Sequence, residues 1–109
     1  MDIQHMIDKS QEKKLNSYRT MLEIVQDLVD RRRTISIYAA EKTHRLSRAY
    51  FYDNKVARAF MDELRAANGH PQKQQRIIEK YRRKVDQFEE NLDLELKQRK
   101  MSMRQKGQI

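Results

Sequence analysis

The sequence predicts an all-α protein, and three observations lead to that prediction. The 109 residues contain only two glycines and one proline, whereas sheet proteins need turn residues about every 8–12 positions. Two long segments place apolar side chains at alternating steps of three and four residues, which is one face of an α-helix. Charged residues make up 37% of the chain, against roughly 25% in an average domain. We expect a small helical domain, or one with a helical extension, with a polar surface.

The first predicted helix runs from about residue 2 to Asp30. Its apolar side chains lie on one stripe, at steps of three and four residues: Leu15, Tyr18, Leu22, Val25 and Val29. Ile3, Met6 and Ile7 extend that stripe only weakly, because residues 8–14 are almost wholly polar. We therefore expect the first turns of this helix to fray or to protrude from the core.

Short helices are predicted in the centre of the chain, each opened by a residue that caps helices. Serine and threonine oxygens accept hydrogen bonds from the free N–H groups of a first turn. The segment 33–36 therefore marks a boundary, followed by a short helix over residues 37–43. Ser47 opens the next helix, which runs through Tyr52. Asp53 and Asn54 either interrupt that helix or cap a further one, which carries Val56, Phe60, Met61 and Leu64.

Residues 67–71 form the clearest break, because Gly69 suits the position after a helix end and Pro71 disfavours helix just before it. They separate a helical domain, residues 1–66, from an amphipathic heptad helix, residues 72–100, and a basic tail, residues 101–109, predicted to be disordered. The heptad stripe consists of Ile78, Tyr81, Val85, Phe88 and Leu92. It buries itself on a neighbouring helix of the same chain or pairs with another chain; the pattern leaves both possibilities open.

Positive charge concentrates in the middle of the chain. The whole sequence has a net charge of +8, and residues 31–58 alone hold eight basic and two acidic side chains. The same segment holds three of the five tyrosines, Tyr38, Tyr50 and Tyr52. Basic residues interleaved with aromatic and hydroxyl groups suit a surface that contacts phosphates and lies in a groove of nucleic acid. Basic charge alone does not choose between DNA and RNA.

The order of elements predicts a helix-turn-helix at about residues 34–54. Residues 37–43 are its first helix, 44–46 its turn, and Ser47 begins its recognition helix, with Leu46 and Phe51 filling the angle between the two. The start of such a helix reaches base edges, so Arg48 would pair with guanine and Ala49 or Tyr50 would meet a thymine methyl. Phosphates would be contacted from positions on either side. The predicted DNA-binding residues are Thr34, Lys42, Arg45, Ser47, Arg48, Ala49, Tyr50, Tyr52 and Lys55.

The segment from Leu46 to Tyr52 resembles the recognition helix of TetR-like regulators, which often has the pattern Val/Leu-Ser-x-x-x-Phe-Tyr. Ser47, Phe51 and Tyr52 fall on that spacing. With the upstream residues 34–43, the layout is also similar to small accessory proteins of tyrosine-recombinase transposons, in which a helix-turn-helix precedes a coiled coil. This resemblance covers about residues 33–65 and implies a DNA-binding regulator or a recombination or replication accessory factor. His44 and Arg45 replace the usual Ala-Gly of the turn, where glycine supplies a positive φ.

Two other classes of protein use the same features. A helical adaptor or secretion partner would bind another helical protein through the heptad faces. An enzyme resembling the all-helical chorismate mutases would hold a dicarboxylate with cations such as Arg31 and Lys42, but the carboxylate and glutamine partners that it needs cannot be placed. We therefore expect no enzyme, no catalytic residues and no small-molecule substrate. The expected partners are DNA, a second copy of the chain in a homodimer, or a helical protein.

The sequence lacks the motifs of most cofactor, metal and membrane sites. There is no cysteine, which excludes disulfides, thiolate zinc sites and cysteine nucleophiles. His5, His44 and His70 lack the spacing of metal ligands, and no phosphate-binding or dinucleotide-binding glycine motif occurs. No run of 18 apolar residues is present, and the first residues do not read as a secretory signal. We predict no cofactor, no metal and no membrane partner, and a cytoplasmic location.

Overall fold

The computed structural model describes the backbone of residues 3–107 and the side chains of residues 10–98. Within residues 3–107 it contains five helices and no strand: α1 (Ile3–Asp30), α2 (Ile37–Glu41), α3 (Arg48–Asp53), α4 (Lys55–Ala66) and α5 (Pro71–Gly107). The all-α prediction is confirmed.

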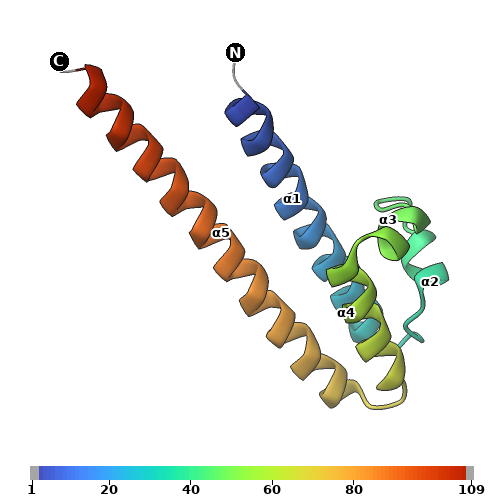
Figure 1. The fold of residues 1–109 in the computed structure, drawn as a ribbon. Coiled ribbons are helices and arrows are strands. Elements are labelled where there is room, and N and C mark those ends of the chain that lie inside the picture. The colour runs from blue at the N-terminus through green and yellow to red at the C-terminus, as the bar shows by residue number, and fades with distance from the viewer. Residues whose placement is uncertain (1–2, 108–109) are drawn as a thin grey trace.

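The two long helices, α1 and α5, run antiparallel and form an elongated hairpin (Figure 1). The molecule measures 62 × 25 × 19 Å along its principal axes. α4 packs on this pair near its closed end, while α2 and α3 project to one side. Toward the chain termini, α1 and α5 diverge. The short helices therefore form a lobe attached to one flank of a helical body.

The core lies where α1, α4 and α5 meet, and both predicted stripes enter it. Tyr18, Leu22, Val25 and Val29 of the first stripe are buried, and Leu15 is half-buried. From the second stripe, Ile78, Tyr81 and Val85 are buried, Phe88 packs edge-on against Tyr18 with ring centroids 5.8 Å apart, and Leu92 is half-exposed. The heptad stripe therefore packs mainly within its own chain.

The helix ends differ from the prediction in two places. α2 stops at Glu41 instead of 43, because the next backbone N–H groups turn back to carbonyls three residues earlier: that of Thr43 bonds to Ala40 and that of His44 to Glu41. α5 continues through Gly107, beyond the expected end at 100, so the backbone of 101–107 is helical where a disordered tail was predicted. Residues 97–106 contain no glycine or proline to stop the helix. The side chains of 99–109, like those of Ile3, Met6 and Ile7, lie outside the described residues.

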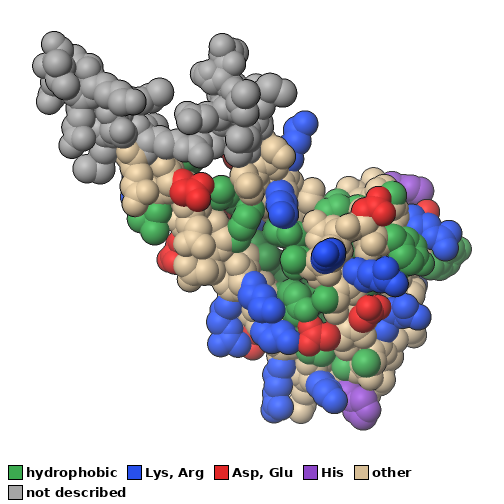
Figure 2. All heavy atoms as spheres, viewed as in Figure 1, with side chains coloured by type: hydrophobic (Ala, Val, Ile, Leu, Met, Phe, Trp, Pro, Cys, Tyr) green, Lys and Arg blue, Asp and Glu red, His purple; other side chains and the backbone are tan. Residues whose placement is uncertain are grey.

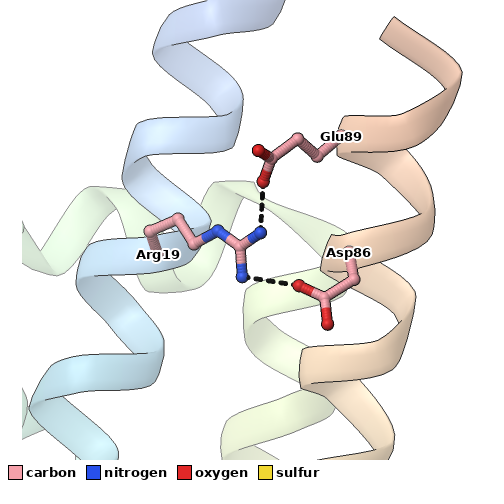
Figure 3. A network of polar contacts seen from close by, with 3 residues as sticks. All are labelled: Arg19, Asp86 and Glu89. Carbon is pink, nitrogen blue, oxygen red and sulfur yellow. Dashed lines mark hydrogen bonds and ion pairs between the residues drawn. The ribbon is translucent and has the colours of Figure 1, made fainter. Parts of the chain in front are cut away.

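A polar clamp fixes α1 against α5 beyond the core. The guanidinium of Arg19 on α1 pairs with Asp86 at 2.8 Å and with Glu89, both on α5 (Figure 3). The hydrogen bond with Glu89 raises the pKa of Arg19 above its usual value, with Asp86 adding to the effect. Because these side chains are partly exposed, the pairs contribute little stability.

Candidate nucleic-acid interface

The central helices begin at the capping residues that the sequence predicts. The hydroxyl oxygen of Ser36 accepts from the Ala39 N–H at 3.0 Å, and that of Ser47 accepts from the Tyr50 N–H at 3.2 Å. Asn54 both ends α3 and caps α4, its side-chain oxygen accepting from the Ala57 N–H at 3.0 Å. Asn54 therefore starts a new helix, one of the two possibilities that the sequence left open. Caps matter here because α2 and α3 have only five and six residues and helices this short are not stable alone.

The turn between α2 and α3 keeps a left-handed residue although its glycine is missing. His44, which stands in the segment where the resemblance leads us to expect Ala-Gly, has a φ of 59°. A side chain in this region costs roughly 1–2 kcal/mol relative to the right-handed conformation. Leu46 then packs against the core and Phe51 is fully buried, as the helix-turn-helix interpretation predicts.

A second left-handed residue, Arg32, ends α1 with a φ of 56°. The N–H of Arg32 bonds to the Val29 carbonyl at 3.0 Å, and that of Arg33 to the Leu28 carbonyl at 2.9 Å. This pattern is the Schellman motif, in which glycine usually takes the left-handed position. Here an arginine takes it, so the end of α1 carries three consecutive exposed cations, Arg31 to Arg33.

The segment that follows is fixed to the body by a side-chain clamp. The amide of Asn68, in the turn between α4 and α5, accepts from the Ile35 N–H at 3.0 Å and donates to the Ile35 carbonyl at 3.2 Å. Buried Gln74 donates to the same Asn68 oxygen at 3.1 Å and to the Leu64 carbonyl at 3.1 Å. Ile35 itself is buried. The arginine segment therefore sits on a fixed backbone rather than on a loose loop.

Most of the predicted DNA-binding side chains reach the surface of the lobe. The exposed ones are Thr34, Lys42, Arg45, Ser47, Arg48, Ala49, Tyr52 and Lys55. Figure 2 shows basic side chains spread over this side of the molecule, interleaved with exposed hydrophobic ones. These residues come from the segment between α1 and α2, from the turn between α2 and α3, from α3 and from the start of α4.

Tyr50 is the exception, because it is half-buried. Its ring packs edge-on against Phe51 with centroids 5.5 Å apart, and its hydroxyl is buried without a hydrogen-bond partner. Burial, with a smaller effect of Tyr18, raises its pKa above the usual value. Tyr50 packs against the core and lies near Tyr18 of α1, so it is less accessible to a ligand than the other predicted residues.

The two arginines nearest the turn have different surroundings. The guanidinium of Arg45 pairs with Glu23 on α1, which offsets its charge and draws it toward the body. Arg48, the first residue of α3, forms no ion pair within residues 10–98, and its guanidinium carbon lies 5.7 Å from the centroid of the Tyr52 ring. A cation stacked on an aromatic ring keeps its charge while its orientation is restricted. Arg48 is therefore the better placed of the two to contact a ligand.

Tyr38 belongs to this surface too, although the predicted DNA-binding residues do not include it. Tyr38 is 67% exposed and lies under Lys42, whose amino nitrogen is 4.9 Å from the ring centroid. It lines a small hollow of about 210 Å³ together with Ser36, Ile37, Glu41, Arg48, Tyr52 and Arg65. Tyr38 follows the buried Ile37 and lies two residues before the buried Ala40, so it is on the outer face of α2. Helical periodicity in the sequence could have indicated this position.

A larger hollow of about 650 Å³ lies between the end of α1 and α2. Its lining includes Arg31, Arg32, Arg33 and Lys42, with Thr34, Ser36 and Thr43 supplying hydroxyls. Asp27 is its only acidic lining residue, and it pairs with Arg31 at 3.1 Å. The hollow therefore offers an excess of positive charge and hydroxyl donors, which is the chemistry that phosphate groups require.

Comparison with known families places the chain in one family. The model of a family of unknown function, DUF6262, matches residues 2–108. The chain belongs to this family. No curated protein and no solved structure matches it.

No group of three or more acidic, histidine or cysteine side chains that could hold a metal ion occurs in the part of the chain that the structure describes. None of its helices there combines the length and the apolar composition that crossing a membrane requires.

Proposed function

We propose that this protein binds DNA through the helix-turn-helix formed by α2 and α3. The observation that carries the proposal is the position of Arg48. It is exposed, it forms no ion pair within residues 10–98, it stacks on Tyr52, and it is the first residue of a helix capped by Ser47. In helix-turn-helix proteins the start of the recognition helix meets base edges.

The residues around Arg48 take complementary roles in this proposal. Arg48 pairs with a guanine, the commonest specific contact in the major groove, and Ala49 lies against a thymine methyl. Lys42, Thr34, Tyr52 and Lys55 contact phosphates, which position the protein without reading sequence. Arg45 contributes less, because Glu23 already offsets its charge.

We further propose a cytoplasmic transcription regulator or an accessory factor of recombination or replication. A homodimer would place two α3 helices on the two half-sites of a palindrome. The alternative, a helical adaptor that binds through the heptad stripe, is less well supported, because Ile78, Tyr81 and Val85 are buried in the chain's own core. An adaptor would have to bind its partner through a surface other than the heptad stripe.

Fluorescence anisotropy with a labelled duplex of about 30 base pairs, three helical turns, tests the proposal. We expect log K to fall linearly with log salt concentration, because Lys and Arg displace counterions. On a duplex selected for tight binding, Arg48→Ala should cost about 1–3 kcal/mol and relax the preference for that sequence.

Arg83→Ala is the matched control, because it removes another exposed arginine, this one from α5. It should leave the sequence preference unchanged. Absence of salt-dependent binding even at low salt would contradict the proposal as a whole. Binding that survives Arg48→Ala with its sequence preference intact would contradict the assignment of α3 as the recognition helix.

A further inference from the structure

A second basic hollow lies outside the helix-turn-helix, where the end of α1 meets the turn between α4 and α5. Its volume is about 700 Å³, and its lining consists of Val29, Arg32, Gly69, His70, Pro71, Gln72, Lys73 and Arg76. Three permanent cations face it and none of these lining residues is acidic. None of them belongs to the DNA-binding set that the sequence predicts.

The charges of this hollow are not offset by neighbours within residues 10–98. Arg32, Lys73 and Arg76 are exposed, and none of them forms an ion pair in that part of the chain. A hollow of about 360 Å³ on the same hairpin gives the contrast: there Arg19 and Arg82 share the lining with Glu23, Asp27 and Asp30. The first turn of α5 also lacks an acidic residue, so nothing there reduces the positive end of the helix dipole.

Arg32 lines this hollow and also the 650 Å³ hollow beside α2. The two hollows are therefore neighbours, and together they form one basic track. The track runs from Lys42 on α2, past the arginines at the end of α1, to Lys73 and Arg76 on α5. The hydrogen bonds between Asn68 and Ile35 join the segment after α1 to the turn before α5, and so connect the two parts of the track.

We propose that the hollow at the start of α5 binds the phosphate backbone of DNA that flanks the segment contacted by α3. The inference rests on the proposed function and extends it, because the site on DNA becomes longer than a helix-turn-helix alone would contact. The cations neutralise phosphates and release counterions, so they add affinity without adding sequence preference.

The test compares two duplexes that share one centre, a short one of about one helical turn and a long one of about two and a half turns. Anisotropy titrations over a salt series give the slope of log K against log salt for each. The variant Lys73→Gln/Arg76→Gln should lower the magnitude of the slope by about two on the long duplex, at roughly 0.9 per phosphate contact, and leave the short duplex unchanged.

The matched control is Arg83→Gln/Lys84→Gln, which removes one arginine and one lysine from exposed positions further along α5. We expect it to change neither slope. Equal slopes for wild type and Lys73→Gln/Arg76→Gln on the long duplex would overturn the inference. An equal loss on both duplexes, or the same loss in the control, would also overturn it, because net charge would then explain the effect.

A third arm separates DNA from a free anion. Inorganic phosphate, titrated while thermal unfolding is followed, would stabilise the wild type and not Lys73→Gln/Arg76→Gln if the hollow held free phosphate. That result, together with no effect of duplex length, would overturn the inference in favour of a small anion. Failure of the wild type to bind either duplex would instead contradict the proposed function, so the two failures are distinguishable.

Discussion

The body of the molecule and its lobe are stabilised in different ways. In the body, α1, α4 and α5 each bury large apolar side chains, including Met21, Phe60 and Ile78. In the lobe, α3 buries only Phe51, and α2 buries Ile37 and Ala40. The conformation of the lobe instead depends on helix caps, on the hydrogen bonds between Asn68 and Ile35, and on the left-handed residues Arg32 and His44. The lobe exposes Tyr38, Tyr52 and most of the basic side chains of residues 31–58. Stability is concentrated in the body, and the surface suited to a ligand is concentrated in the lobe.

The largest effect should come from removing the one fully buried side chain of α3, Phe51. Phe51→Ala should lower the free energy of unfolding by about 3–5 kcal/mol, because it deletes a fully buried ring and leaves a cavity. Urea denaturation followed by circular dichroism measures this loss. Tyr52→Ala, one residue further and exposed, should cost about 0.5 kcal/mol or less. Equal losses for the two variants would mean that the lobe is not attached through Phe51.

The sequence predicted what depends on local pattern and missed what depends on tertiary neighbours. The caps at Ser47 and Asn54 follow from side-chain chemistry next to an apolar run, and both are found. The heptad stripe predicted which face of α5 is buried, but it did not predict which helices that face packs against. Periodicity does not identify the opposite surface. The half-buried position of Tyr50 could not be predicted for the same reason: it depends on α1, which no pattern around position 50 contains.

An intermediate effect should come from the clamp between the lobe and the body. Asn68→Ala removes the side chain that satisfies both backbone groups of the buried Ile35. Leaving buried polar groups without partners should cost about 1–3 kcal/mol. Amide hydrogen exchange should then show the largest loss of protection at Ile35. Asn91→Ala removes an exposed asparagine whose side chain bonds to Gln87, also exposed, and it should change stability by about 0.5 kcal/mol or less.

Arg32→Gly should have the smallest effect on stability, but it tests the difference between body and lobe most directly. This variant should raise stability while it weakens DNA binding. Arg32→Gly relieves a left-handed side chain, worth roughly 1–2 kcal/mol, while glycine adds about 0.4–1 kcal/mol of unfolded-state entropy. The net result should be a gain of about 0.5–1 kcal/mol in the free energy of unfolding. The same variant removes a cation from both basic hollows, so the salt slope of DNA binding should fall by about 0.9.

Two further variants separate these contributions. Arg32→Ala loses the cation but keeps the strain, so it should weaken binding without raising stability. His44→Gly, at the other left-handed position, should raise stability by a similar amount without changing the salt slope. Thermal unfolding of all three variants measures the effect of backbone strain on stability, and anisotropy measures the effect of the Arg32 charge on DNA binding. If Arg32→Gly were less stable than the wild type, the arginine would be stabilising the end of α1, and its left-handed conformation would not be a net cost.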